Sequence, residues 1–174
     1  MQMRDFVVRF AGEGGQGVVT SAEGLAQTST HAGYHALTFA TFPSQIMGGP
    51  TWTQARISVE PVLSPGDDVD VLVAFNREAY DAHQGDVRDD GVIIFNSNEF
   101  QLDGELRGFG LPVDDLARST GNNRAANMVI IGALAHLVNM PREHLERFVE
   151  KRFSRGRSTD EEIITSNILA VNLG

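Results

Sequence analysis

The chain has 174 residues, of which 41% are hydrophobic, and its formal net charge is −9 at pH 7. This length suits one domain with a buried core, and the negative charge argues against nonspecific binding to nucleic acid or to an anionic membrane. The absence of cysteine excludes disulfides, thiolate nucleophiles, Cys-ligated zinc and cysteine-bound iron–sulfur clusters on this chain.

The first predicted elements are a strand and a helix joined by a glycine-rich turn. The apolar run Phe6 to Phe10 predicts the strand, four glycines follow within residues 12–17, and a helical pattern runs from Val18 to about Ala32. Glycine reaches positive φ without a Cβ clash and lets another molecule approach the main chain. The free N–H groups and the dipole at the start of such a helix attract anions such as phosphate.

Two interpretations of this turn remain open. The spacing Gly12-x-Gly14-x-x-Gly17 fits the dinucleotide fingerprint, but the acidic residue expected about 20 positions later is missing, since Glu60 is the first acidic residue after Glu23. No Lys-Ser or Lys-Thr pair follows the glycines, which excludes a Walker A loop. We prefer an anion or phosphate cradle without NAD specificity; the alternative is a tight turn that binds nothing.

The next segment predicts a second strand, a shaped loop and a third strand. Tyr34 to Phe42 reads as a strand that completes a βαβ unit, which implies a parallel pair with a right-handed crossover. The loop that follows has two prolines and the pair Gly48-Gly49, and it leaves the carboxyl end of this strand. Thr51 to Glu60 alternates between apolar and polar residues, which predicts an antiparallel edge region with one solvated or docking face.

Two buried central strands are predicted at residues 69–75 and 91–95, with a short helix at 77–84 between them. Asn76 and Asn96 follow these strands. If both strands run parallel to the first, their amides lie at the same sheet edge as the glycine turn. The alternative is ordinary turn chemistry, because asparagine readily terminates strands.

The rest of the chain predicts a short peripheral strand at 108–113 and three helices. The segment 123–138 is apolar almost all round, and Gly132 within it indicates close packing. One amphipathic helix begins at Pro141, and the last begins with the capping box Thr159-x-x-Glu162. The predicted fold class is α/β: a three-layer α/β/α, Rossmann-like, mostly parallel sheet with an antiparallel edge region. We expect a single module over 1–174, with 141–174 as a helical C-terminal extension.

Self-sufficient catalytic chemistry is missing from the sequence. The five histidines form no HExxH arrangement, no GxSxG elbow exists, and no GDG motif of the thiamine-diphosphate and magnesium type is present. We therefore expect no catalytic residue and no metal ligand on this chain. No run of 18 apolar residues and no signal peptide is visible, which favours a soluble, cytoplasmic protein.

Five segments of the chain form a recognisable set: GEGGQGVVTSAEGLA, SQIMGGP, DVLVAFN, GVIIFNSNEF and NMVIIGALA. Together they resemble the gamma chain or domain of the 2-oxoacid:ferredoxin oxidoreductases, most of all its 2-oxoglutarate branch. The resemblance implies the fold of domain III of pyruvate-ferredoxin oxidoreductase and a part in oxidative decarboxylation of a 2-oxoacid with coenzyme A (CoA). It implies that thiamine diphosphate, magnesium and iron–sulfur clusters sit on alpha, beta and delta partner subunits, with ferredoxin an indirect partner. In isolation the chain could pair as a homodimer.

The resemblance also assigns two candidate sites. A CoA phosphate would be held by the glycine turn, at Gly12, Gly14, Gly15, Gln16, Gly17 and Thr20. A substrate loop would comprise Ser44, Gln45, Met47, Gly48 and Gly49. Relatives commonly read S-E-I-R-G-G in this loop, so Gln45 and Met47 replace a Glu and an Arg, and a bidentate donor is lost. Either an internal ion pair was exchanged for neutral residues or the substrate contact differs.

A function from a different class stays open beside this one. The chain could be a stand-alone nucleotide- or CoA-binding regulatory module, or a scaffold without catalysis whose glycine loop is only a turn.

Overall fold

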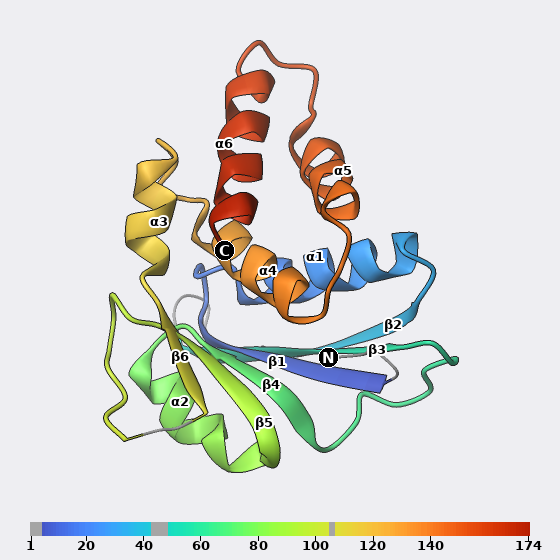
Figure 1. Ribbon diagram of the computed structural model, residues 1–174, viewed down its shortest axis with the longest axis vertical. Helices are drawn as coiled ribbons and strands as arrows, with labels where there is room; N and C mark the ends of the chain where they lie inside the picture. The colour runs from blue at the N-terminus through green and yellow to red at the C-terminus, as the bar shows by residue number, and fades with distance from the viewer. Residues whose placement is uncertain (1–4, 43–48, 105–106) are drawn as a thin grey trace.

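The computed structural model describes residues 5–42, 49–104 and 107–174. Its centre is a six-stranded sheet in the order β2-β3-β1-β4-β5-β6 (Figure 1). The strands are β1 (Asp5–Glu13), β2 (His35–Thr41), β3 (Pro50–Ser58), β4 (Val69–Ala74), β5 (Val87–Asn96) and β6 (Gly108–Leu111).

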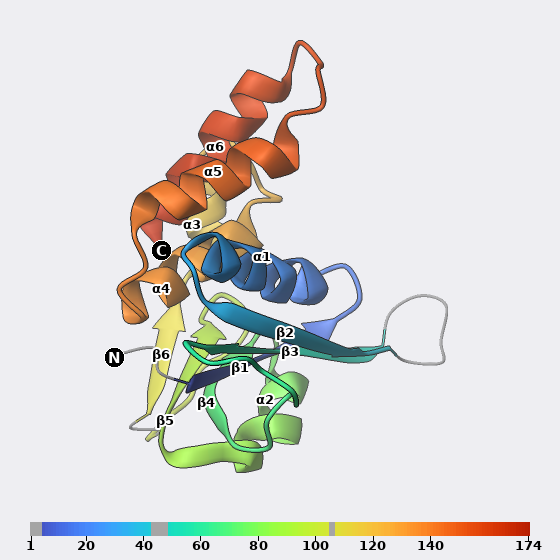
Figure 2. The same ribbon diagram turned by 90° about the vertical axis from the view of Figure 1, so that its right-hand side faces the viewer.

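Helices cover both faces of this sheet unequally. They are α1 (Val18–His31), α2 (Arg77–His83), the 3-10 helix η1 (Gln84–Asp86), α3 (Val113–Ser119), α4 (Ala126–Leu137), α5 (Arg142–Phe153) and α6 (Asp160–Leu173). α1 and α4 lie on one face, and α5 and α6 lie over them, farther from the sheet (Figure 2). α2 lies on the opposite face. In the described part of the chain, no helix is long and apolar enough to cross a membrane.

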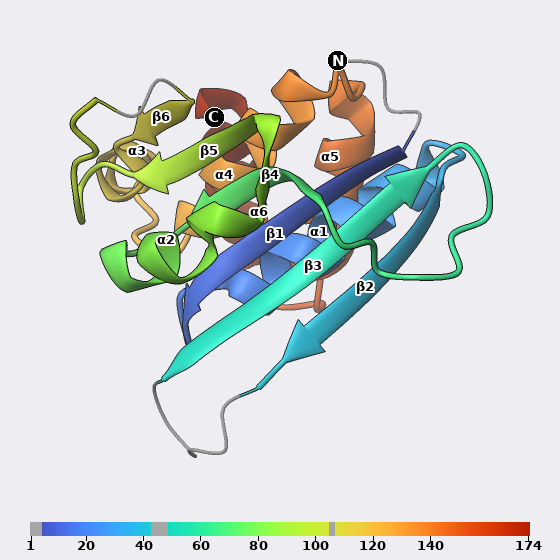
Figure 3. The ribbon, with the colours of Figure 1, turned by 90° about the horizontal axis from the view of Figure 1, so that it is seen from below.

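The strand directions confirm a mostly parallel α/β sheet with an antiparallel region. β1 pairs in parallel with β4, β4 with β5, and β5 with β6. β3 is antiparallel to both of its neighbours, β1 and β2 (Figure 3). The carboxyl ends of β1, β4, β5 and β6 therefore meet at one edge of the sheet.

One local prediction about this region was wrong. β1 and β2 point the same way but are not adjacent, because β3 lies between them and pairs with β1 from Asp5↔Ser58 to Glu13↔Pro50. β3 is thus an inner strand, and β2 forms the edge. Of the two alternatives for the polar side of β3, a solvated face is contradicted, since Gln54 is only 2% exposed and accepts two hydrogen bonds from the Arg9 guanidinium, and a docking face stays a prediction.

The larger hydrophobic core lies between the sheet and the helices α1 and α4. Alternate residues of β1, Phe6, Val8 and Phe10, are fully buried there. α4 is buried on most of its circumference because α6 covers the side that faces away from the sheet. A Cβ added to Gly132 would lie 2.1 Å from the carbonyl oxygen of Val171 in α6, so the predicted close packing at this glycine is confirmed.

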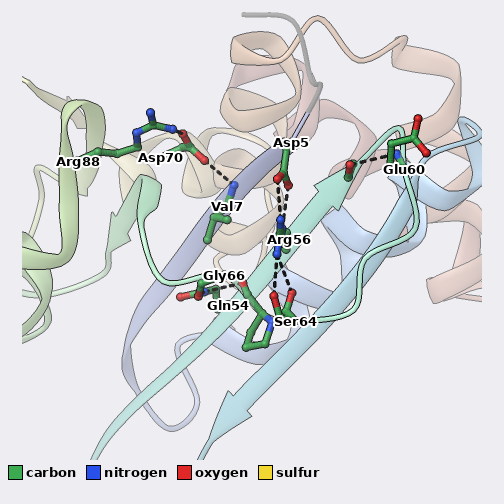
Figure 4. A network of polar contacts seen from close by, with 11 residues as sticks. Asp5, Val7, Gln54, Arg56, Glu60, Ser64, Gly66, Asp70 and Arg88 are labelled. Atoms are coloured by element: carbon green, nitrogen blue, oxygen red, sulfur yellow. Dashed lines mark hydrogen bonds and ion pairs between the residues drawn. The ribbon is translucent and has the colours of Figure 1, made fainter.

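A polar network fastens the β3–β4 connection at the amino end of the parallel strands, opposite the glycine turn (Figure 4). The Arg56 guanidinium donates to Asp5 at 2.6 Å and to the Ser64 hydroxyl at 2.8 Å. The hydrogen bond from Arg56 lowers the pKa of the Asp5 carboxyl. Asp70 accepts from the Val7 N–H at 2.8 Å and from Arg88 at 2.7 Å, which links β4 to β1 and β5. These contacts hold the sheet in register at this end.

The predicted capping box at the start of α6 was wrong. Thr159 takes the N-cap position, but its side chain makes no capping hydrogen bond. The carboxylate of the neighbouring Asp160 accepts hydrogen bonds from the backbone N–H groups of Arg155 at 2.5 Å and Arg157 at 3.0 Å. These bonds lower the pKa of Asp160 and close the turn between α5 and α6.

Candidate functional site

The glycine turn begins later than the sequence pattern indicates, because β1 continues through Glu13. Gly12 is a strand residue paired with Thr51, and it is buried. A Cβ on Gly12 would lie 2.5 Å from Gln16 Oε1 and 2.9 Å from Phe75 Cβ. Glycine is therefore required here by close packing of the turn against β1 and the end of β4.

The side chain of Gln16 closes the turn. Its Oε1 accepts from the Glu13 backbone N–H at 2.7 Å and from Asn76 Nδ2 at 3.4 Å. Gly15 and Gly17 have φ of 102° and 87°, where a side chain would be strained. Gln16 thus shapes the loop, and the exposed Gly14 and Gly15 present main chain to solvent.

The start of α1 carries the positive end of the helix dipole, and no acidic side chain in its first turn neutralises it. Gly17 is its N-cap, no side chain caps it, and its first turn contains no acidic residue. The first N–H groups of a helix have no intrahelical partner, and the dipole adds a partial positive charge. Thr20, in this turn, is half-buried, and its hydroxyl has no hydrogen-bond partner among the described residues. This arrangement suits a phosphate or carboxylate.

Asn127 of α4 lies against this helix start, a contact between residues far apart in the sequence. A Cβ built on Gly17 would be 2.9 Å from Asn127 Cβ and 3.3 Å from its Nδ2. α4 also begins without a capping side chain and without an acidic residue in its first turn. Within the part of the chain that the structure describes, the Asn127 carboxamide makes no hydrogen bond. The only sequence signal was a polar residue in the first turn of an apolar helix.

A cavity of about 240 Å³ begins at Thr20 and continues between α1 and α5. From α1 it is lined by Thr20, Glu23, Gly24 and Gln27, and from α5 by Phe148, Lys151 and Arg152. Thr20 is the lining residue that belongs to the first turn of α1.

A smaller cavity of about 130 Å³ lies on the α2 side of the turn, lined by Gly12, Glu13, Thr51, Asn76 and His83 among others. Burial and the neighbouring Arg9 guanidinium lower the pKa of His83, so this imidazole is neutral at pH 7. Its polar contacts are internal to the fold.

The cluster beside this smaller cavity is built around Arg9. The Arg9 guanidinium stacks on the Trp52 ring at 4.6 Å and forms an ion pair with Asp86. His83 lies 3.3 Å from the same guanidinium. These contacts tie β1, β3 and α2 together below the glycine turn.

The two strand-ending asparagines do lie at the same sheet edge as the glycine turn, because β4 and β5 run parallel to β1. Their amides are used locally, however. Asn76 Oδ1 caps α2 by accepting from the Ala79 N–H at 2.8 Å, and Asn96 Nδ2 donates to Asp114 at 3.0 Å. The turn-chemistry interpretation fits both residues.

Four of the predicted substrate-loop residues, Ser44, Gln45, Met47 and Gly48, lie outside the described residues. Gly49 is described, with φ of 106°, and it precedes Pro50, which pairs with Glu13 at the end of β1. The hydroxyl of Thr51 donates to the carbonyl of Thr41 at 2.7 Å. The residues flanking the loop therefore lie beside the glycine turn, and the role of the loop stays a prediction.

The described residues contain no group of three or more His, Asp or Glu side chains that could hold a metal ion. The sequence as a whole lacks cysteine. The candidate site offers main-chain N–H groups, the Thr20 hydroxyl and the Asn127 carboxamide, groups of the kind that can bind an anion.

The chain is similar to subunits of known 2-oxoacid oxidoreductases. The model of the pyruvate ferredoxin/flavodoxin oxidoreductase family matches residues 7–174. The ketoisovalerate oxidoreductase subunit VorA of Methanothermobacter marburgensis is 35% identical over 139 residues, covering 78% of this chain and 29% of that protein. The pyruvate synthase subunit PorC of Methanothermobacter thermautotrophicus is 32% identical over 139 residues, covering 76% of each.

Among solved structures, the chain resembles the 2-oxoglutarate:ferredoxin oxidoreductase of Magnetococcus marinus, which contains bound 2-oxoglutarate, coenzyme A and succinyl-CoA. The TM-score is 0.86 at 29% identity, over 99% of this chain and 31% of that one. The chain thus spans about a third of the length of the VorA relative and of this structure.

Proposed function

Because the chain belongs to the pyruvate ferredoxin/flavodoxin oxidoreductase family, we propose that it is the gamma component of a 2-oxoacid:ferredoxin oxidoreductase. The complex would decarboxylate a 2-oxoacid, join the acyl group to the CoA sulfur, and release CO₂, a proton and an electron pair that reduces ferredoxin. Thiamine diphosphate, magnesium and iron–sulfur clusters would sit on alpha, beta and, where present, delta polypeptides. This chain would bind and position, and would contribute no catalytic residue.

The uncapped start of α1 carries this proposal. Its free N–H groups, its dipole and the adjoining Asn127 would hold a phosphate of CoA. Gly15 allows close approach, since nothing lies within 4 Å of a Cβ built there. The Magnetococcus marinus relative, which binds coenzyme A, supports the choice of ligand.

We propose 2-oxoglutarate as the substrate, supported by the same relative. Because other relatives are named for ketoisovalerate and pyruvate, the substrate has to be measured directly. Gln45 and Met47 leave the loop without an arginine, so in this proposal the second carboxylate of 2-oxoglutarate is bound by groups outside the loop.

Exposed apolar residues support docking onto other subunits. In the described structure no helix covers β2 and β3 on the α2 side (Figure 3), where Phe39 is 46% exposed and packs against Trp52 with ring centroids 5.7 Å apart. Phe42, just beyond β2, is 72% exposed. An apolar sheet face of this kind is typical of a surface covered by a partner.

The test is reconstitution with thiamine-dependent partner polypeptides from the same source. CoA-dependent viologen reduction is measured with 2-oxoglutarate, pyruvate and ketoisovalerate. We expect 2-oxoglutarate to be preferred, and we expect the joint change Gly14→Val and Gly15→Val to raise the KM for CoA at least about tenfold. Gly156→Val is the matched control, since its φ is 74° and its surroundings are open, but it lies in the α5–α6 turn.

Normal turnover with both glycines replaced would overturn the phosphate-holding role. Turnover with pyruvate or ketoisovalerate alone would overturn the choice of substrate. CoA binding by the chain, without activity with any partner, would favour the stand-alone regulatory module.

A further inference from the structure

The two edges of the sheet differ in how well they are protected against pairing with another strand. β6, at one edge, has four residues, two of them glycine, and Pro112 follows it directly. β2, at the other edge, has seven residues and contains no proline, glycine, lysine, arginine, aspartate or glutamate. It pairs with β3 from His35↔Ser58 to Thr41↔Trp52 without a bulge. Natural sheets protect exposed edges with short strands, charges, prolines and bulges, and β2 has none of these.

The outer side of β2 is an open row of main-chain groups. β2 is the outermost strand on its side of the sheet (Figure 3). Among the described residues, no main-chain hydrogen bond joins β2 to a segment other than β3. Alternate residues of an antiparallel strand direct their N–H and C=O groups to opposite sides, so those of every second residue of β2 point away from β3. The chemistry of such a row matches another β-strand.

The two strands at this end of the sheet carry no carboxylate, in contrast to the chain as a whole. The net charge is −9, yet no aspartate or glutamate occurs between Glu23 and Glu60, a stretch that contains both β2 and β3. Carboxylates on the surfaces of two copies repel one another and keep most faces of the molecule apart. Copies that meet along β2 avoid this repulsion between the strands that meet, so the edge suits a second copy of the chain.

The sequence of β2 also complements itself when two copies run antiparallel. A two-fold axis through Thr38 sets Leu37 opposite Phe39 of the second copy, and Ala36 opposite Ala40. Directly opposite residues share a face of the sheet, so the first pair extends the apolar surface at Phe39, which is 46% exposed. Thr38 lies opposite its own copy, where the two hydroxyls are able to form a hydrogen bond.

We propose that the outer edge of β2 is a dimerisation surface, on which β2 of a second copy pairs antiparallel about a two-fold axis through Thr38. The two sheets then form one continuous sheet. Because β6 is short and rich in glycine, it offers no second edge of this kind, and the association closes at the dimer. The inference stands apart from the proposed function, since it needs neither a ligand nor another polypeptide.

Sedimentation equilibrium of the 174-residue chain between about 5 and about 500 µM tests this surface. The wild type should show a reversible equilibrium between monomer and dimer. Thr38 is exposed, and Thr38→Lys or Thr38→Glu each places like charges opposite one another, which should raise the dissociation constant of the dimer at least about tenfold. An equimolar mixture of the two variants places opposite charges there and should restore the dimer.

The matched control is Thr159→Lys. This residue is also exposed, lies at the start of α6, and makes no side-chain capping hydrogen bond. The control should dimerise like the wild type, because the same substitution then adds the same charge away from β2.

A wild type that stays monomeric over this range overturns the inference, and so does a dimer that persists in Thr38→Lys. Loss of the dimer in both variants without recovery in the mixture also overturns it, because the two copies then do not meet at Thr38. Circular dichroism checks that both variants fold. If either is unfolded, hydrogen exchange of the wild type decides: the β2 amides should exchange more slowly at high than at low protein concentration, and equal rates overturn the inference.

Discussion

Replacing Gly17 by alanine tests the geometry of the candidate site through stability alone. Gly17 has φ of 87° and ψ of 16°, and a residue with a side chain in this left-handed region costs about 1–2 kcal/mol. The new Cβ would also lie 2.9 Å from Asn127 Cβ, and such overpacking costs about 1–3 kcal/mol. We expect Gly17→Ala to lower the free energy of unfolding by about 2–5 kcal/mol.

Gly15→Ala is the matched comparison, because its φ is 102° but nothing lies within 4 Å of the added Cβ. This change should lower the free energy of unfolding only by the cost of the left-handed backbone conformation, about 1–2 kcal/mol. Urea unfolding followed by circular dichroism gives both values, with an unchanged m-value expected. A difference of about 2 kcal/mol between the variants corresponds to about 4–8 °C in Tm for a chain of this size. Equal stability of the two variants would refute the contact between the start of α1 and α4.

Three further predictions concern stability. Gly132→Ala gains about 1 kcal/mol of helix propensity, but its Cβ would lie 2.1 Å from the Val171 carbonyl oxygen, so urea unfolding should show a net loss of about 1–3 kcal/mol, whereas a stabilised variant would contradict the α4–α6 packing. Burial and Arg9 lower the pKa of His83 from 6.5, so the unfolded state binds the proton more readily and stability falls as the pH drops from 6.5 towards the folded-state pKa. His83→Gln should remove that fall, and a thermal unfolding profile identical to that of the wild type over this range would argue against it. Backbone hydrogen bonds lower the pKa of Asp160 below 3.8, so its carboxylate stabilises the fold above that pH. This stabilisation is lost as the pH falls through the pKa of Asp160 in the folded state. Asp160→Asn should therefore be less stable than the wild type at pH 7, with the gap closing in acid, and a constant gap would contradict this.

The pattern of strands and helices was largely readable from the sequence, because burial imposes its period on each element. The apolar runs around Val71 and Ile93 became the central strands β4 and β5, and the apolar segment 123–138 became α4. Gly132 predicted close packing because glycine is costly within a helix. The mostly parallel sheet with its antiparallel region followed from the same patterns.

What failed depends on contacts between distant residues. The order β2-β3-β1 could not be predicted, since a strand, a helix and a strand look the same whether or not another strand is inserted between them. α3, at Val113–Ser119, was missed because its seven residues are too short for a helical period to stand out.

The candidate site was predictable only in part, for the same reason. The glycine turn at Gly15 and Gly17 carries a local signal, because positive φ favours glycine. Asn127 joins the turn through the packing of α4 against α1, over a separation of 110 residues from Gly17, and nothing in its own neighbourhood announces that contact. The cavity at Lys151 likewise exists only where α5 crosses α1.

The most direct test of the account is an amide-resolved NMR titration of the chain with coenzyme A. The central claim is that main-chain N–H groups at the start of α1 hold a phosphate of this ligand. We expect the largest shifts at the amides of residues 14–20 and at the Asn127 carboxamide, and a loss of these shifts in Gly15→Val. Shifts confined to other parts of the sheet, or unchanged spectra at saturating ligand, would contradict the claim.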